Sequence, residues 1–568
     1  MKGIKVLFPI NNPEDIRICE KVNAKKVYVS HKYFIANGFE TLFEFQEMAK
    51  KYKADLYVNL ASDILDKDNV YIKDILNFLE NQNIKGIMVN SLAVLEYLKL
   101  RELPFEIIID SDMNIHNVSS IEFIKLFNRV DYINLSEEIY LKNVAKIKKM
   151  VKTKLCINTN NLPWIAEDVI KSKHIDMVIL KADLQNWKEI FRAVILIEKI
   201  LENPKIYKNK KLPFKIFSDG TYETNHFTGE FLSNKGKDFK FSGNIKPFDW
   251  TFKSTRLSKN FSQKIKRPKL CLRMNSLLQL RALKRYIQKM GFNPVDSIEY
   301  GEILNTVDLS KKSFNMILDI VKDFCEEYNI KLKLGTPKTL IERDFDRTYE
   351  YEKQLFDHKP PHSMVINNLG FWWTVINDPD YDKLPIELGP NLNLINGESI
   401  LSLANQRYIE SVELSNFIDI RDIENCIETI KDEVPVRKLA IAGSIRIPCS
   451  GLCPLNMDSA VLSRLSCPAP CQKRRFAITD KDRNKNYTIL VDGFCRMHLY
   501  RDKVLDLFKY IRFLEKIGIN EFIIDFNALT SKLVPVLLTR YLNALCAETY
   551  QPDEHFLDKL YYLNVYTQ

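Results

Sequence analysis

Two series of short apolar segments, rich in β-branched residues, run along this chain, and each series contains eight segments. Within each series the segments alternate with longer amphipathic stretches, a rhythm that indicates βαβ units and a parallel sheet. The segments are 4–8, 26–29, 55–59, 86–90, 105–109, 131–135, 154–158 and 176–180, then 269–274, 297–302, 330–334, 364–368, 386–388, 409–414, 438–442 and 522–526. Eight such units close a (β/α)8 barrel, so we predict an α/β chain with two TIM-like (β/α)8 barrels.

An ungapped internal match supports a duplication. At a constant offset, DMNIHN at 112–117 aligns with NLNLIN at 391–396. The Ser-Ile pair at 120–121 aligns with Ser-Ile at 399–400, and the Leu-Ser pair at 135–136 aligns with Leu-Ser at 414–415. Self-similarity over so long a period is typical of a repeated fold. The chain has 568 residues, enough for both copies.

The expected domains follow from these series. We predict a first barrel over 1–204, a small β-rich insertion over 205–267, a second barrel over 268–550 and a C-terminal tail over 551–568. The first barrel has no counterpart of the cysteine-rich segment 446–495 of the second. We therefore expect it to be a degenerate copy that completes a cleft or holds a partner protein.

Basic and aromatic residues interleave within the predicted insertion. Single-stranded nucleic acids are bound by such mixtures, through stacking and phosphate contacts. Alternating strands with aromatic residues packed inward and lysines outward give the same pattern, and we favour that interpretation. The residues are Phe239, Phe241, Phe248, Trp250, Phe252 and Phe261 with Lys237, Lys240, Lys246, Lys253, Arg256 and Lys259.

Five of the eleven cysteines cluster in the second half, as CSGLC, CPAPC and a later VDGFC: Cys449, Cys453, Cys467, Cys471 and Cys495. In a reducing compartment, clustered thiols point to metal or redox chemistry rather than to disulfides. Soft thiolates suit an iron–sulfur cluster or zinc, and CxxxC spacing favours iron–sulfur over the CxxC of zinc ribbons. Zinc, or core cysteines without a ligand, are the alternatives.

Other features narrow the class of protein. No apolar stretch is long enough to cross a membrane, and the N-terminal run 4–10 is too short for a secretory signal, so we expect a soluble cytoplasmic protein without a membrane span. The net charge of +10 permits binding to RNA or to anionic substrates. GxSxG, GxxxxGK[ST], GxGxxG and HExxH motifs do not occur, so the sequence gives no signature of a serine hydrolase, P-loop protein, Rossmann protein or zinc protease.

The cysteine motifs carry a family resemblance. The chain has a Ser450-Gly-Leu-Cys453 turn, a Cys467-Pro-Ala-Pro-Cys471 element followed by the basic run 472–475, and Asp492-Gly-Phe-Cys495. Asn393 and Asn396 precede a predicted helix, and Glu413 lies at a strand end. In these features the chain resembles peptidase family U32, the collagenase-like peptidases. It departs from the usual pattern because Cys449 lies a few residues after the expected first cysteine, near Arg446, and because SRLS precedes Cys467.

This resemblance implies a four-iron four-sulfur (4Fe-4S) cluster and hydroxylation without dioxygen. Members of the family act in this way on transfer RNA, ribosomal RNA or ubiquinone precursors, with prephenate as the hydroxyl donor. We accordingly expect an iron–sulfur hydroxylase acting on an RNA base or on a small aromatic or peptide substrate. A peptidase or peptide-processing enzyme, and a metal-stabilised scaffold that binds RNA or protein, are the alternatives.

Several residues are candidates for the site. Arg446 and Arg474 flank the thiols, and their guanidinium groups could clamp a dicarboxylate such as prephenate; the alternative is that they only balance the charge of a thiolate-bound cluster. Asn393, Asn396 and Glu413 lie at predicted carboxyl ends of strands, where substrate is positioned. The amides could instead bond to loop backbone, as asparagine often does at turns.

Overall fold

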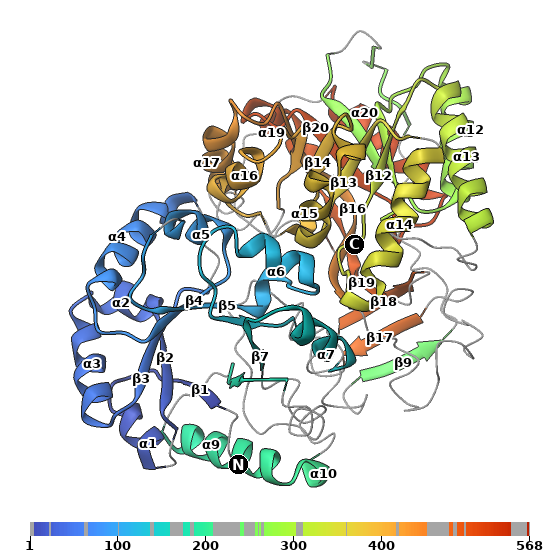
Figure 1. Cartoon of the computed structure of the whole chain (residues 1–568). Coiled ribbons are helices and arrows are strands. Elements are labelled where there is room, and N and C mark those ends of the chain that lie inside the picture. The colour runs from blue at the N-terminus through green and yellow to red at the C-terminus, as the bar shows by residue number, and fades with distance from the viewer. Residues whose placement is uncertain are drawn as a thin grey trace. The chain divides into compact units, whose positions relative to one another are not determined.

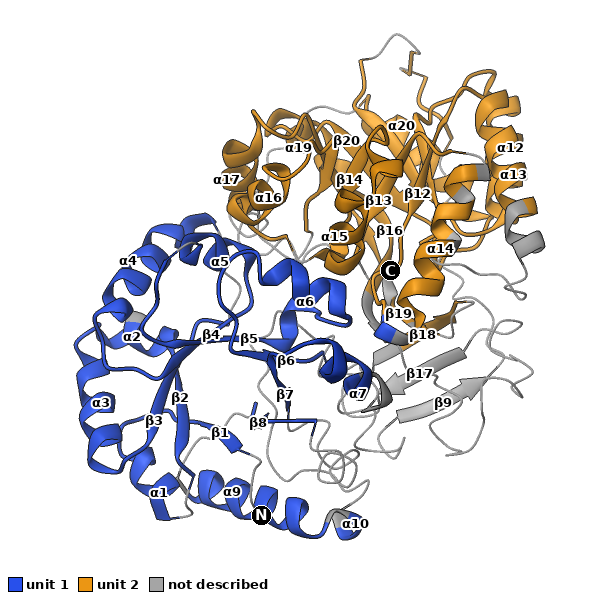
Figure 2. Cartoon of the chain, in the orientation of Figure 1, with its two compact units in different colours: residues 1–237, 341–343 blue, residues 238–340, 344–568 orange. Residues whose placement is uncertain are grey.

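A computed structural model of the chain divides into two compact units, which we describe separately (Figures 1 and 2). Unit 1 comprises residues 1–237 and 341–343, and unit 2 comprises 238–340 and 344–568. The residues described by the structure are 5–21, 24–61, 66–99, 101–136, 141–158, 174–181, 187–207, 239–243, 256–259, 261–262, 266–302, 311–358, 360–392, 394–415, 420–450, 476–480, 485–492, 496–546 and 565–566.

Unit 1 contains a closed barrel of eight parallel strands, because β1 pairs with both β2 and β8. The strands are β1 (Lys5–Pro9), β2 (Lys26–Ser30), β3 (Asp55–Asn59), β4 (Gly86–Val89), β5 (Glu106–Ile109), β6 (Tyr132–Asn134), β7 (Lys154–Asn158) and β8 (Met177–Ile179). Each of the eight predicted segments of the first series forms one of these strands. The first barrel of the prediction is therefore confirmed.

Helices and helical turns connect these strands and lie outside the barrel (Figure 1). They bury apolar stripes against it: in α4, Ile72, Ile75, Leu76 and Leu79 recur at helical spacing and are all buried. The elements are α1 (Asp15–Lys21), α2 (His31–Asn37), α3 (Thr41–Lys51), η1 (Asp66–Asp68), α4 (Asn69–Glu80), α5 (Leu92–Leu98), η2 (Ser111–Met113), α6 (Val118–Ile124), α7 (Leu141–Met150), α9 (Trp187–Glu202) and α10 (Pro204–Tyr207).

Unit 2 contains a second closed ring of eight parallel strands. The ring closes because β16 pairs with β15 and β20, and β20 pairs with β10. The strands are β10 (Lys269–Arg273), β11 (Ser297–Tyr300), β12 (Lys331–Gly335), β13 (Ser363–Ile366), β14 (Ile386–Leu388), β15 (Ser411–Glu413), β16 (Val436–Ser450) and β20 (Glu521–Asp525). All eight predicted segments of the second series are among them, so the second barrel is confirmed as well.

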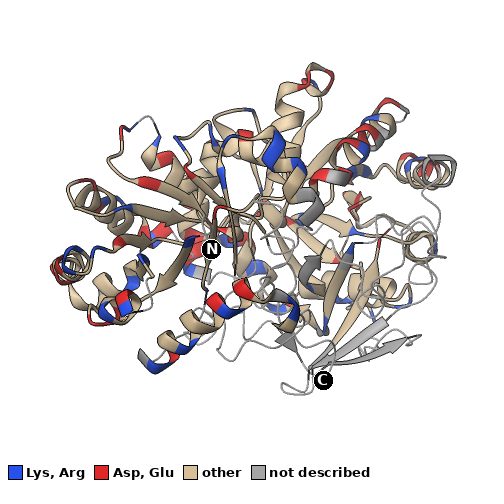
Figure 3. Ribbon diagram, turned by 60° about the horizontal axis from the view of Figure 1, so that its bottom comes forward, with Lys and Arg blue, Asp and Glu red and all other residues tan. Residues whose placement is uncertain are grey.

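The helical elements between the strands of unit 2 also lie outside their barrel (Figure 1). Along the outer helices of each unit, basic and acidic residues are interspersed (Figure 3). The elements are α12 (Leu277–Met290), α13 (Lys311–Glu327), α14 (Glu342–His358), α15 (Leu369–Asn377), η4 (Pro379–Tyr381), η5 (Pro390–Leu392), α16 (Gly397–Ala404), α17 (Ile420–Ile430), η7 (Phe508–Tyr510), α19 (Ile511–Lys516) and α20 (Leu533–Ala544).

Strand β16 is longer than predicted and continues beyond the barrel. There it joins an antiparallel sheet in the order β16-β19-β18-β17-β9, and β21 pairs with β19. Strand β16 bends away at Gly443, whose φ is +117°; a Cβ there would lie 2.0 Å from the backbone oxygen of Asp525. The added strands are β9 (Phe239–Gly243), β17 (Phe476–Asp480), β18 (Lys485–Val491), β19 (Met497–Asp506) and β21 (Val565–Tyr566).

The predicted insertion 205–267 lies largely outside the described residues. Within the described part, β9 is a strand of the insertion, and it pairs with β17 of the second half of the chain. Phe261 stacks on Phe292, with ring centroids 5.6 Å apart. The strand interpretation thus holds for β9, while nucleic-acid binding by this segment stays a prediction.

Two asparagines that the internal repeat aligns have the same structural role. The Oδ1 of Asn117 accepts a hydrogen bond from the backbone N–H of Ser120 at 2.8 Å and begins α6. The Oδ1 of Asn396 accepts from the N–H of Ser399, also at 2.8 Å, and begins α16. Both side chains therefore satisfy an N–H group that the helix leaves without an intrahelical partner. Of the two interpretations left open for Asn396, the bond to loop backbone is the one observed.

We expect Asn396→Ala to lower the free energy of unfolding by about 1 kcal/mol, because the N-cap hydrogen bond is lost. Urea unfolding followed by circular dichroism measures the change. Asn405→Ala, at the exposed C-terminal end of the same helix, is the matched control and should be close to wild type. Unchanged stability in Asn396→Ala would contradict the capping role.

Candidate active site at the carboxyl ends of the second barrel

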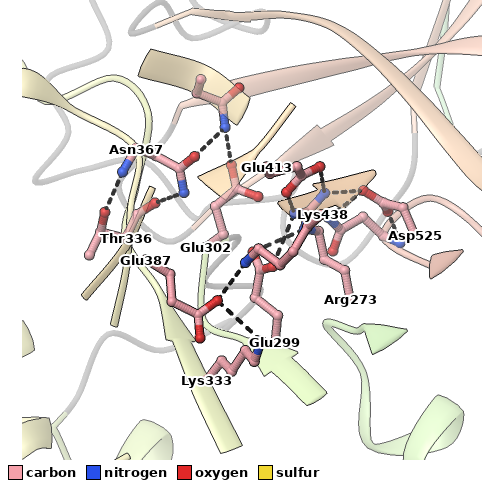
Figure 4. A network of polar contacts seen from close by, with 12 residues as sticks. Arg273, Glu299, Glu302, Lys333, Thr336, Asn367, Glu387, Glu413, Lys438 and Asp525 are labelled. Carbon is pink, nitrogen blue, oxygen red and sulfur yellow. Dashed lines mark hydrogen bonds and ion pairs between the residues drawn. The ribbon is translucent and has the colours of Figure 1, made fainter. Parts of the chain in front are cut away.

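The interior of the second barrel contains a network of charged side chains that includes Arg273 (Figure 4). Arg273 is the last residue of β10, and its guanidinium forms a bidentate pair with Glu299 of β11, Nε to Oε1 at 2.9 Å and Nη2 to Oε2 at 3.0 Å. The same group bonds to Glu413, at the end of β15, and reaches Oδ2 of Asp525, at the end of β20, at 3.3 Å. One buried cation thus holds three buried carboxyl groups together at the carboxyl ends of the strands.

The cluster contains three carboxyl groups around one guanidinium group, and the pKa values of two of the carboxyl groups are raised. Burial raises the pKa of Asp525 to about 6, although Arg273 acts in the opposite direction. Burial also raises the pKa of Glu413, and the like charge of Glu299 adds to this effect against the attraction of Arg273. The site therefore contains carboxyl groups that can hold a proton at a higher pH than an exposed carboxyl group would.

A chain of polar side chains continues the site above this cluster. The Oε1 of Glu302 binds the guanidinium of Arg446 and accepts from Nδ2 of Asn391 at 3.0 Å. The same Nδ2 donates to Oδ1 of Asn367 at 2.7 Å, and the Nδ2 of Asn367 donates to the backbone oxygen of Thr336 at 2.9 Å. Burial would raise the pKa of Glu302, but Arg446 and Arg273 outweigh it, so the pKa lies below its ordinary value. Arg446 is thus already paired with a carboxylate.

Charged residues also fill the layer of the barrel below the site. Lys333 bonds to Oε2 of Glu387 at 3.1 Å and to Oε1 of Glu521 at 2.6 Å, and Lys438 binds Glu387 as well. Burial alone would raise the pKa of Glu387, yet the two ammonium groups hold it well below its usual range. Ser363 and Ser411 donate to the same carboxylate at 2.5 and 2.7 Å. The charged groups of this layer are thus paired with one another directly below the polar site.

Asp492 and Arg496 lie on either side of segment 493–495, which contains Cys495 and is outside the described residues. Arg496 donates from its backbone N–H to Oδ1 of Asp492 at 3.0 Å and from Nε to Oδ2 of Asp492 at 2.6 Å. His498 Nε2 lies 3.0 Å from the same Oδ2, and Arg496 Nη1 donates to the backbone oxygen of Thr339. Burial opposes ionisation of Asp492, but Arg496 and His498 lower its pKa to about 2, so Asp492 and Arg496 form a buried ion pair.

The strand register brings the Asp492–Arg496 pair close to the end of β16. Cys449 pairs with His498, and Ser450 pairs with Met497, across the antiparallel β16–β19 ladder. On its other edge, β19 pairs His498 with Leu490 of β18, two residues before Asp492. The backbone of Cys449 therefore lies opposite His498, whose side chain contacts Asp492.

The predicted site residues divide into three groups. Glu413 and Arg446 lie in the polar networks described above. Cys449 is placed by its backbone register, and Asn396 is a helix cap. The remaining candidates lie outside the described residues: Asn393, Cys453, Cys467, Cys471, Arg474 and Cys495. Their roles stay predictions.

Several residues of the network were not predicted from the sequence: Arg273, Glu299, Glu302, Asn367 and Asp525. Arg273, Asn367 and Asp525 are each the next-to-last residue of a predicted strand, Glu302 ends one, and Glu299 lies inside one. A polar residue within an otherwise apolar strand is the sequence signal for these positions.

Within the described ranges, no group of three or more His, Cys, Asp or Glu side chains is arranged to hold a metal ion. Four of the five clustered cysteines lie outside those ranges. A search of the described helices for membrane spans finds none that is long and apolar enough.

The chain contains two barrels, each built of eight parallel strands, and one has a buried polar site at the carboxyl ends of its strands. These features define a protein of the (β/α)8 barrel class. Residues 11–159, within the first barrel, match the family model described as Peptidase family U32. The cysteine motifs that resemble this family lie in the second half of the chain, and the match to the family model lies in the first half.

Solved structures similar to parts of the chain include the U32 peptidase Mk0906 (10% identity, 33% of this chain and 95% of that chain, TM-score 0.26). A putative fructose-1,6-bisphosphate aldolase from Coccidioides immitis matches at 14% identity over 35% and 89%, with a TM-score of 0.27. The C-terminal domain of a putative chitinase from Desulfitobacterium hafniense matches at 7% over 49% and 100%, with a TM-score of 0.29. At such TM-scores we draw nothing about function from these likenesses. No curated protein matches the sequence.

We expect Arg273→Met to lower the free energy of unfolding by about 3–5 kcal/mol, because three buried carboxyl groups lose their counter-ion. Without Arg273 the folded-state pKa values of these carboxyl groups rise above the unfolded values, so stability falls as pH increases through the raised pKa values. The loss should therefore be larger at pH 8 than at pH 5. Chemical unfolding at both pH values measures it, with exposed Arg285→Met as control. A pH-independent loss would contradict the charge argument.

We expect the infrared absorption of a protonated carboxyl group to disappear as pH rises past about 6, the pKa to which burial raises Asp525. Asp525→Asn should lack that component, whereas exposed Asp432→Asn should retain it. A wild-type titration near pH 4 alone would show that Asp525 is not perturbed.

Proposed function

We propose that this chain is an iron–sulfur enzyme that hydroxylates an RNA base, or a small aromatic or peptide substrate, without dioxygen. The reaction would take place at the carboxyl ends of the second barrel. The observation that carries the proposal is the register of β16 with β19, in which Cys449 lies opposite His498, three residues after Cys495 in the sequence. The family match supports the enzyme class.

The donor set fits such a cofactor by its chemistry. Cys449, Cys453, Cys467, Cys471 and Cys495 would supply the thiolates, and thiolates are the ligands of iron–sulfur clusters. A bound cluster would supply redox or Lewis-acid chemistry. The ion pair between Asp492 and Arg496 fixes the residues that flank segment 493–495 in the sequence, and such supporting contacts are needed to hold a ligand such as Cys495 in place.

The polar site offers the groups that a hydroxyl donor needs. Prephenate, the donor suggested by the family, carries two carboxylates. Arg446 can bind one of them when its ion pair with Glu302 is broken. Asp525 can take or give a proton, because its pKa lies near 6. Hydroxylation oxidises the acceptor, and the donor that loses its hydroxyl group is reduced in exchange.

RNA is the acceptor class we prefer. The formal charge of +10 and the basic, aromatic composition of 205–267 support this choice. Comparing RNA and metabolites of a deletion strain with those of its parent by mass spectrometry tests it. An RNA fragment lighter by one oxygen atom in the deletion strain would support RNA hydroxylation, and the same change in a small aromatic compound or peptide would redirect the assignment.

Anaerobic purification tests the cofactor. We expect a brown protein that contains iron and acid-labile sulfide and absorbs near 400 nm, on the order of the value for thiolate-to-iron charge transfer. Cys449→Ser and Cys495→Ser should each lose most of the iron, whereas the control Cys546→Ser, in a partly exposed cysteine outside the cluster, should keep it. A colourless protein with stoichiometric zinc would favour a metal-stabilised scaffold. Cleavage of casein that survives metal depletion would favour a peptidase.

A further inference from the structure

The inward-facing residues of the first barrel form an apolar layer covered by a polar one. The apolar layer includes Leu7, Tyr28, Tyr57, Met88, Ile108, Tyr132, Cys156, Met177 and Ile179, all buried. Side chains of a strand alternate between its two faces, so the residue two positions further toward the carboxyl end faces inward again. Those residues are polar in seven of the eight strands, the exception being Pro9 of β1. Ser30 of β2 begins helix α2, and we call the other six the polar crown: Asn59, Asn90, Asp110, Asn134, Asn158 and Lys181.

Hydrogen bonds connect most of the crown. Lys181 Nζ lies 2.8 Å from Oδ2 of Asp110, and also contacts Ser111 Oγ at 3.2 Å and Asp112 Oδ2 at 3.4 Å. The Nδ2 of Asn134 donates to Oδ1 of Asp110 at 2.9 Å and to Oδ1 of Asn158 at 2.7 Å. The side chains of four neighbouring strand ends, β5 to β8, are thereby fixed in one network at the carboxyl end of the barrel.

Two acceptors of the crown have no partner. The Oδ1 atoms of Asn134 and Asn90 are buried without a hydrogen bond, and these side chains belong to residues that are 0% and 6% exposed. Both N–H groups of the Asn134 amide are already used, so the unfilled capacity of this amide is for accepting. An unpartnered buried oxygen is costly and is rare in native proteins. If this layer had only a structural role, apolar residues like those of the layer below it would make the folded protein more stable.

The chemistry of the crown selects the ligand class. Its free groups are hydrogen-bond acceptors, so the ligand must donate, which hydroxyl groups do. The ammonium of Lys181 would repel a cationic ligand, and Asp110 and Asp112 would repel an anionic one, so the ligand is neutral. The side chains of Lys181 and Asp112 are 17% and 20% exposed, so the network reaches solvent at that edge.

We propose that the first barrel has a binding site of its own at the polar crown, for a small neutral polyhydroxylated compound such as a sugar or polyol. The amide oxygens of Asn134 and Asn90 accept hydrogen bonds from its hydroxyl groups. The site is independent of the cysteine cluster and of the proposed hydroxylation, and it gives the first barrel a role besides that of a degenerate copy.

Saturation-transfer NMR on the full-length protein tests the site, with glycerol, D-ribose and D-glucose as probes. We expect transfer to at least one probe, and an affinity about tenfold lower in Asn90→Ala, which removes an acceptor that bonds to nothing in the protein and so should not impair folding. Asn134→Leu should abolish binding. Asn81→Ala, at the exposed end of α4, is the control and should bind as wild type does.

Two outcomes would overturn the site. If no probe receives saturation transfer, the crown is a structural network whose spare oxygens are met by buried water. If Asn90→Ala and Asn134→Leu both bind a probe as tightly as wild type, the probe binds elsewhere on the protein. Because the readout is binding, neither result depends on iron content or on hydroxylation.

Discussion

The guanidinium group of Arg273 is the interaction on which the second barrel depends. It binds carboxyl groups from β11, β15 and β20, which would otherwise repel one another inside a closed ring of strands. All four residues are at least nine-tenths buried, so water contributes little to separating their charges. The paired layer of Lys333, Glu387, Lys438 and Glu521 lies beneath it. The polar site formed by Glu302, Asn391 and Arg446 lies above both layers.

The two barrels share a strand frame and differ in what they enclose. Both begin a corresponding helix with an asparagine cap, Asn117 in one and Asn396 in the other. The first barrel encloses a layer of tyrosine, methionine and aliphatic residues, with polar residues toward both ends of its strands. The second encloses charged residues in two layers, around Arg273 and around Glu387, which is a costly arrangement for stability alone.

The sequence predicted the barrels well and the site only in part. All sixteen strands were found, because short apolar segments between amphipathic stretches leave little choice of fold. The antiparallel extension of β16 was missed, since 443–450 mixes apolar, basic and small residues and its partner, β19, is chosen by tertiary contacts. Glu413 was predicted at a strand end and lies at one, and Arg446 was predicted beside the cysteine cluster, but their ion-pair partners, Arg273 and Glu302, were not identified.

By itself, the sequence determined the number and order of the strands, the duplication and the cysteine-rich segment, because each is a local pattern or a repeat of one. Tertiary structure alone decided which charges meet inside the second barrel. The partners of Arg273 lie 26, 140 and 252 residues further along the chain. Only closure of the sheet brings them within hydrogen-bond distance, and burial then sets their pKa values, because a carboxylate removed from water depends on the few charges that remain beside it.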